Sequence, residues 1–158
     1  MRRSSHGAVP ESDVAIFRRK HPPKAVPEDQ MADVRMAASA AARFLRESGY
    51  RDDFSEESLA DADAFLAICL ATSQGPDRQT LAGAFGCYLG ETLRRCLDAQ
   101  WVFDASDDLE VRTPKGSRAF PVTIVAKKLR PEGDWKSLAA VPQANRAIEE
   151  RALSAKET

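Results

Sequence analysis

Three glycines inside one predicted helix constrain the fold of this chain more than any other feature. Residues 77–98 carry apolar side chains at helical spacing, and Gly83, Gly86 and Gly90 form a bare strip along the flank of the apolar face. Each glycine in a helix interior costs roughly 1 kcal/mol relative to alanine, so we expect close packing against another backbone to offset that cost. The segment is therefore predicted to be a central helix. The strip is predicted to be a packing surface, because a phosphate-binding loop needs a strand-to-helix turn.

Two further helices are predicted before this segment. Pro27 suits the first position of a helix, and Gly49 is placed to end that helix with a left-handed residue. A second helix is predicted to start at Ser55, whose hydroxyl can cap free backbone amides, and to end before Gly75. The expected buried positions of the two helices are Met31, Val34, Ala38 and Leu45, then Leu59, Ala62, Leu66, Cys69 and Leu70.

Short strand-like runs follow the glycine-containing helix. Residues 101–103 and 109–112 predict a hairpin, and residues 118–120 predict a third strand after a turn at 114–117. Residues 121–129 have both strand propensity and helical spacing, and we favour a helix because Pro121 suits its first turn. Beyond them, residues 134–158, which include Trp135, form a weakly amphipathic pattern that Pro142 interrupts, and its last turns are expected to fray.

These elements together predict an α+β fold. A central glycine-containing helix packs with two N-terminal helices and a small antiparallel three-stranded meander, and further helices lie at the C-terminus. The 158-residue length suits one domain, which we expect over residues 28–158. Residues 1–27 hold several prolines and the basic run 18–21 with little apolar periodicity, and we interpret them as a disordered arm.

The net charge and the cysteines of the chain limit its expected partners and its expected cellular compartment. The sequence has 23 basic and 24 acidic side chains, so no overall field draws it towards nucleic acid or membrane. No apolar run is long enough to span a bilayer, and no secretory signal is recognised. Cys69, Cys87 and Cys96 are odd in number and lack paired spacing, which favours a reducing compartment and a cytoplasmic location.

The sequence offers little catalytic or metal-binding chemistry. His6 and His21 both lie in the predicted arm, so the predicted domain lacks the side chain most often used as a general base. The cysteines show no metal-ligand spacing, and Cys87 and Cys96 are predicted on opposite faces of one helix. We therefore expect no metal and no cofactor, and the sequence favours a non-enzymatic protein.

Glu91 is the carboxylate that we single out, because it follows Gly90 beside the glycine strip. It can pair with Arg95 one helical turn on, and Tyr88, Arg94 and Trp101 complete the set of residues expected near it in a binding surface. Carboxylate catalysis needs a second titratable group in a contrasting environment. The candidates for that second group are Asp61, Asp63 and Asp104, and nothing in the sequence brings them to Glu91.

The run Gly86-Cys87-Tyr88-Leu89-Gly90-Glu91, followed by Trp101 and later by 120–121 and 125–129, resembles a group of uncharacterised bacterial domains of unknown function. In that group a Gly-x-Tyr-x-Gly-Glu helix precedes a tryptophan-led hairpin. The resemblance covers about a third of the chain and implies the same architecture and a bacterial cytoplasmic setting, but no activity. This chain has Ala99-Gln100 where glycine commonly precedes the tryptophan.

The leading hypothesis is a non-enzymatic protein-interaction module, of the adaptor or immunity type. We expect it to bind another protein through the hairpin face or the surface beside Glu91, and a second copy of the chain is a further candidate partner. One alternative is a small hydrolase or transferase that uses Glu91. The other is nucleic-acid binding through the basic arm, which is disfavoured because short basic runs are common.

Overall fold

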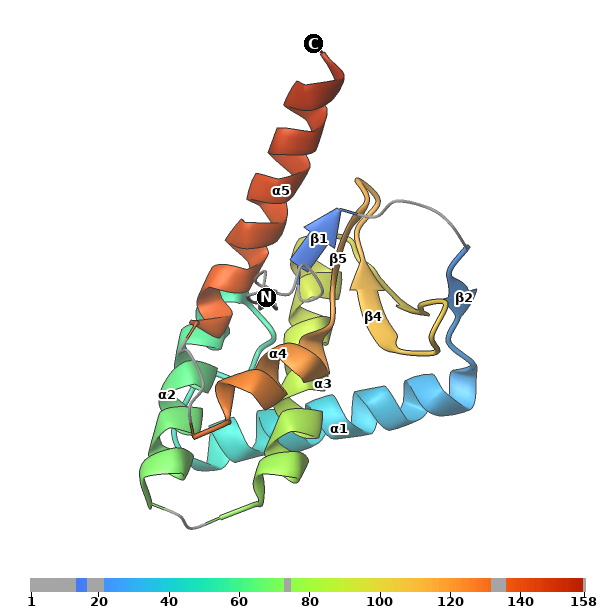
Figure 1. The fold of residues 1–158 in the computed structure, drawn as a ribbon. Helices are drawn as coiled ribbons and strands as arrows, with labels where there is room; N and C mark the ends of the chain where they lie inside the picture. The colour runs from blue at the N-terminus through green and yellow to red at the C-terminus, as the bar shows by residue number, and fades with distance from the viewer. Residues whose placement is uncertain (1–13, 17–21, 73–74, 132–135, 158) are drawn as a thin grey trace, which may run out of the picture.

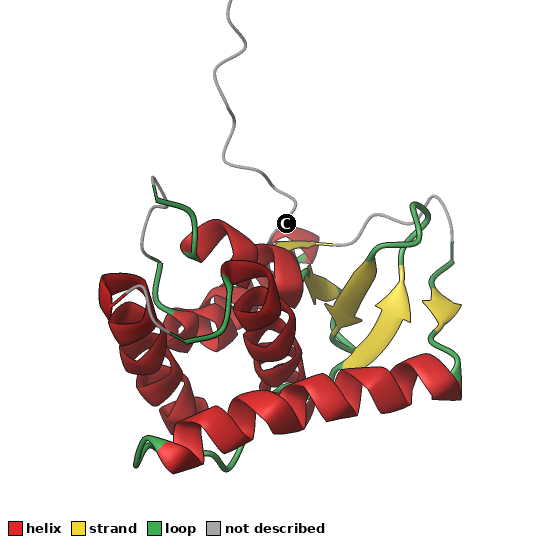
Figure 2. Cartoon of the chain, turned by 90° about the horizontal axis from the view of Figure 1, so that it is seen from below, coloured by secondary structure: helices red, strands yellow, loops and turns green. Residues whose placement is uncertain are grey.

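The computed structural model describes residues 14–16, 22–72, 75–131 and 136–157. The helices are α1 (Glu28–Glu47), α2 (Glu56–Thr72), α3 (Arg78–Cys96), α4 (Pro121–Lys128), a 3-10 helix η1 (Leu138–Ala140) and α5 (Val141–Lys156). The strands are β1 (Val14–Ile16), β2 (Lys24–Ala25), β3 (Gln100–Phe103), β4 (Leu109–Arg112) and β5 (Ser117–Ala119). The predicted α+β class is confirmed. Most of the helices lie on one side of the strands, whereas α1 also runs along below the sheet (Figures 1 and 2).

Helix α3 is the axis of the fold, as predicted. Every residue from Ala84 to Leu93 is buried, so this helix is surrounded on all sides. It packs most extensively against α1 and α4. A Cβ atom on Gly86 would lie 2.5 Å from the Cα of Val122, and one on Gly90 would lie 2.1 Å from the Trp101 ring. Close packing is therefore confirmed at these two glycines.

Gly83 does not follow this prediction. A Cβ atom added there would find no heavy atom of the described residues within 4 Å. The expectation that all three glycines permit close packing is wrong at this position, because the neighbouring helix α4 crosses α3 further along, at Gly86.

Helices α1 and α2 have the ends that their sequences predict. Gly49 has a φ of 79°, and the Tyr50 N–H donates to the Leu45 carbonyl at 2.8 Å in a glycine-based C-cap. The Ser55 hydroxyl accepts a hydrogen bond from the Ser58 N–H at 3.2 Å and so caps the start of α2. Both helices bury the predicted apolar faces in the core, except that Met31, Cys69 and Leu70 are only half-buried.

The sheet has the order β1-β5-β4-β3-β2, and all its pairs are antiparallel. Strands β3, β4 and β5 form the predicted meander, with Trp101 opposite Val111. Strands β1 and β2 were not predicted. They come from the segment interpreted as a disordered arm, and that interpretation is wrong for residues 14–16 and 24–25, which pair with β5 and β3. The basic run 18–21 lies outside the described residues.

The C-terminal part also differs from expectation in one respect. Residues 121–128 form helix α4, as favoured. Pro142, however, lies in the first turn of α5 and starts this helix instead of interrupting it, because a proline needs no hydrogen-bonded N–H there. Helix α5 continues to Lys156 and extends beyond the rest of the molecule (Figure 1), and the expected fraying of its last turns stays a prediction. No helix in the described ranges has the length and apolar character that crossing a membrane requires.

Candidate functional site

Glu91, the carboxylate singled out from the sequence, lies on α3 and is only 5% exposed. Its Oε1 accepts a hydrogen bond from Trp101 Nε1 at 2.9 Å, and its Oε2 accepts one from Arg94 Nη2 at 3.0 Å. The predicted pairing with Arg95 is wrong, because the ion pair forms with Arg94 instead. The structure therefore brings Glu91, Arg94 and Trp101 together as predicted. The Glu91 carboxylate, however, is buried and already bonded to the other two side chains.

The surroundings of Glu91 keep its carboxylate ionised and hold it in place. Burial raises the pKa of its carboxyl group, but the hydrogen bonds from Arg94 and Trp101, with the charge of Arg94, outweigh burial and leave the pKa below its ordinary value. The group is ionised at neutral pH, and both of its oxygens accept hydrogen bonds. A general acid would need a raised pKa, so this environment suits the fixing of the Trp101 ring more than proton transfer.

The other two predicted residues, Tyr88 and Arg95, meet at Phe54. The Tyr88 hydroxyl donates to Ser58 Oγ at 2.7 Å and accepts from the Phe54 N–H at 3.1 Å. Phe54 has a φ of 58°, which is unusual for a bulky residue, and its ring stacks on Tyr88 with the centroids 4.5 Å apart. The Arg95 guanidinium lies over the same ring, 4.3 Å from its centroid. A binding role for these residues stays a prediction.

The three aspartates considered as partners for Glu91 bond elsewhere. Asp61 accepts a hydrogen bond from the Arg51 N–H at 2.7 Å. Asp63 accepts one from Lys128 Nζ at 2.6 Å, and Asp104 accepts backbone N–H groups within its own turn. None of them is among the hydrogen-bond partners of Glu91 in the described structure, so no carboxylate pair forms there.

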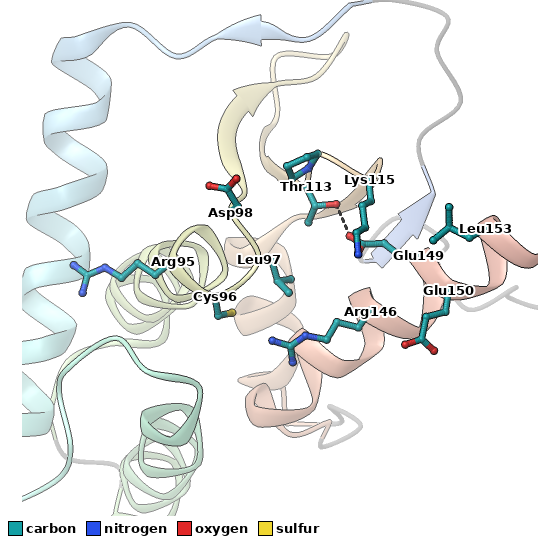
Figure 3. Close-up of a pocket in the computed structure, with 11 residues that line it drawn as sticks. Arg95, Cys96, Leu97, Asp98, Thr113, Lys115, Arg146, Glu149, Glu150 and Leu153 are labelled. Atoms are coloured by element: carbon teal, nitrogen blue, oxygen red, sulfur yellow. Dashed lines mark hydrogen bonds between the residues drawn. The ribbon is translucent and has the colours of Figure 1, made fainter.

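A pocket of about 510 Å³ lies between the end of α3, the β4–β5 turn and α5 (Figure 3). It contains charges of both signs. The lining residues are Arg95, Cys96, Leu97, Asp98, Thr113, Pro114, Lys115, Arg146, Glu149, Glu150 and Leu153.

Glu149 projects from α5 towards the β4–β5 turn and is 7% exposed. Its Oε1 accepts hydrogen bonds from Ser117 Oγ at 2.6 Å and from Thr113 Oγ1. Asn145, one turn earlier, donates to Ser117 Oγ at 3.1 Å. This buried polar cluster attaches the first half of α5 to the sheet, which accounts for the carboxylate without a ligand.

Two other groups that line the pocket, Arg146 and Cys96, interact with Glu56 of α2. Arg146 forms a two-pronged ion pair with Glu56 of α2, and its hydrogen bond outweighs burial to hold the pKa of Glu56 below its ordinary value. Burial, with the nearby charge of Glu56, raises the pKa of the Cys96 thiol to about 11. A thiol that stays protonated at neutral pH is a poor nucleophile and a poor metal ligand. In the described ranges, no group of three or more His, Cys, Asp or Glu side chains could hold a metal ion.

A second depression, of about 610 Å³, is an apolar groove between α3 and α4. Gly83 lies in its lining, which explains why the space beside this glycine is open. We call it the Gly83 groove. It is lined by Arg78, Gln79, Ala82, Gly83, Val122, Ala126, Leu129, Arg130 and Pro131.

Sequence reasoning missed this groove because it depends on where α4 crosses α3. Gly83 and Gly90 lie seven residues apart on almost the same side of the helix, and no sequence signal separates the open position from the packed one. One unusual signal is Arg78, a cation in the first turn of a helix, where a negative charge is favoured.

The fold and these depressions define a small α+β domain in which the predicted site residues are largely engaged in internal contacts. Comparison with protein-family models, curated proteins and solved structures found no match.

Proposed function

We propose that this chain is a non-enzymatic protein-interaction module that binds a partner protein through the Gly83 groove. One observation carries the proposal. A glycine in a helix interior costs roughly 1 kcal/mol relative to alanine, and at Gly83 no described contact offsets this cost. A site that a partner segment occupies would account for both the missing side chain and the open space.

The chemistry of the groove supports binding of an apolar group. Between Arg78 and Arg130 its lining side chains are apolar except for Gln79, and no carboxylate contributes to it. Apolar contact surface in a concave site is the usual source of affinity in protein recognition. The pocket of Figure 3 is a weaker candidate, because Glu149 and Arg146 already bond within the protein.

The surfaces first expected to bind a partner give less support. Glu91, Tyr88 and Trp101 are all buried, and on the hairpin Val102 and Glu110 are buried too. The depressed pKa of Glu91 does not favour the alternative of a hydrolase or transferase that uses this carboxylate. The alternative of nucleic-acid binding rests on the basic run 18–21, which lies outside the described residues.

The test compares two variants that each add one leucine. Gly83→Leu fills the groove from its own lining, whereas Ser39→Leu adds the same side chain to an exposed position of α1 outside the groove. Partners captured by the immobilised wild-type chain are identified and purified, and their dissociation constants are measured by calorimetry. We expect Gly83→Leu to weaken binding at least about tenfold and Ser39→Leu to leave it unchanged.

The thermal midpoint of Gly83→Leu provides the folding control. It should equal or exceed that of the wild type, because leucine is a better helix former than glycine. Unchanged affinity for every purified partner in a folded Gly83→Leu variant would contradict binding through the groove. Turnover of a small metabolite that is lost in Glu91→Gln would contradict the non-enzymatic role.

A further inference from the structure

The rim of the Gly83 groove is positively charged. Arg78 at the start of α3 and Arg130 after α4 are both exposed, and neither forms an ion pair with another described residue. The carboxylate of Asp77 next to Arg78 is used to cap α3, since it accepts the Thr80 N–H at 2.7 Å. An occupant of this groove should therefore carry an apolar side chain with negative charges close to it.

Helix α5 presents such a group at the other end of the molecule. Its last buried residue is Glu149, and beyond it all residues to Lys156 are exposed except the half-buried Ala152. Leu153, with 51% of its surface exposed, is one of the most exposed large apolar side chains described. Burial against a partner surface would remove this exposed apolar side chain from water.

The charges around Leu153 match the rim of the groove. On a helix, the neighbours of Leu153 one turn away are Glu150 and Glu157, together with Lys156. Both carboxylates are exposed, and neither has an ion pair within the described part of the chain. The end of α5 thus offers an apolar side chain between two acids, and the groove offers an apolar channel between two arginines.

We propose that the Gly83 groove is occupied by the C-terminal end of α5 from a second copy of this chain, with Leu153 inserted between Arg78 and Arg130. The contact must be intermolecular, because the end of α5 and the start of α3 lie at opposite ends of one molecule (Figure 1). Two copies can exchange these helix ends reciprocally, so that each contributes one groove and one leucine. The inference rests on the proposed function of the groove and names its occupant.

The first experiment measures molar mass by light scattering and sedimentation over a series from micromolar to millimolar concentration. We expect the wild-type mass to rise towards that of a dimer. Leu153→Asp and Gly83→Leu should each weaken association about 10- to 100-fold, because each removes the burial of one leucine side chain. Ser154→Asp places the same charge one residue away and should have a smaller effect.

A charge-exchange pair then tests the register of the contact. One chain carries Arg78→Glu with Arg130→Glu, and the other carries Glu150→Arg with Glu157→Arg. Each chain alone has like charges at the contact and should stay monomeric, whereas the mixture has opposite charges at both contacts and should form a heterodimer. Exposed ion pairs are screened by salt, so the mixture should dissociate as ionic strength rises.

The outcomes separate this inference from the proposed function. A wild-type chain that stays monomeric throughout the series, or charge-exchange chains that do not associate when mixed, would overturn the second copy as occupant. Partner capture that is lost in Gly83→Leu would still support the groove as a binding surface. If Gly83→Leu changes neither partner binding nor self-association, both proposals fail together.

Discussion

At the scale of single residues, the same amino acid has opposite roles at two positions of one helix. Gly86 permits α4 to approach α3, since a Cβ there would lie 2.5 Å from the Val122 Cα, whereas Gly83 has no described neighbour within 4 Å. The intrinsic cost of glycine in a helix is the same at both sites. The difference between them therefore lies entirely in what surrounds each position.

This difference predicts opposite effects of one substitution. Gly86→Ala should destabilise the fold by about 2 kcal/mol or more, because backbone atoms of α4 must move to admit the methyl group. Gly83→Ala should stabilise it by up to about 1 kcal/mol, because alanine is the better helix former and has free space. Urea unfolding of the two variants and the wild type measures both values. Equal effects of the two substitutions would contradict the packing described for this helix.

The ion-pair partner of Glu91 could not be predicted from the sequence. Glu91 can reach Arg94 or Arg95 equally well from its place on the helix, and the sequence favoured the wrong one. Glu91 pairs with Arg94 because the Arg95 guanidinium lies over the Phe54 ring instead. Phe54 comes from a loop with a left-handed backbone, and no helical pattern places such a residue.

At the scale of elements, a buried ion pair joins three segments that are far apart in the sequence. Lys128 of α4 is only 3% exposed, and its Nζ donates to Asp63 Oδ1 of α2 at 2.6 Å and to the Lys136 carbonyl at 2.9 Å. Asp63 also accepts the Leu138 N–H at 2.9 Å and the Ser137 hydroxyl at 2.6 Å. Burial lowers the pKa of Lys128 and outweighs the opposing effect of the Asp63 carboxylate. One carboxylate thus connects α2, α4 and the start of η1.

We expect Asp63→Ala to cost about 3 to 5 kcal/mol, because it leaves the buried Lys128 without its carboxylate and frees donors at the start of η1. The double variant Asp63→Ala, Lys128→Met should recover part of this loss, since no uncompensated charge then remains. Chemical unfolding of the two variants gives the comparison. A double variant that is less stable than Asp63→Ala would show that the buried charge is not the main cost.

Elements were predictable to the extent that their own residues define them. Ser55 and Gly49 mark helix ends through local hydrogen bonds, and Pro121 starts α4 as its fixed φ predicts. Strands β1 and β2 have three and two residues, which is too short for a periodic pattern, and they are strands only because β5 and β3 pair with them. Pro142 was misjudged because a proline marks the start of a helix as readily as its end.

At the scale of the whole molecule, the chain covers both edges of its central meander with strands that precede it in sequence. Strand β1 pairs with β5 through three residues, and β2 pairs with β3 through two. Helix α5 contacts both β1 and its neighbour β5, so this edge of the sheet is also covered by the C-terminal helix. The α+β class and the central helix were predictable from periodicity. The order of the sheet was not, because it depends on long-range pairing.

Removal of the edge strands is therefore expected to affect both stability and association. A chain that starts at Val26 lacks β1 and β2 and leaves the backbone N–H and C=O groups of β5 and β3 unpaired. We expect it to lose about 2 to 4 kcal/mol of unfolding free energy, and to self-associate because open strand edges pair with other chains. Denaturant unfolding and light scattering measure the two effects.

A chain that lacks only residues 1–13 is the matched control, because it keeps both strands. Adding Gly83→Leu to the shorter chain separates two routes to association, since filling the groove blocks exchange of α5 but leaves open strand edges free to pair. Association of the Val26 chain that persists in Gly83→Leu would identify the edges as its cause, which is the expected result. A Val26 chain as stable and as monomeric as the control would mean that β1 and β2 contribute no protection to the sheet.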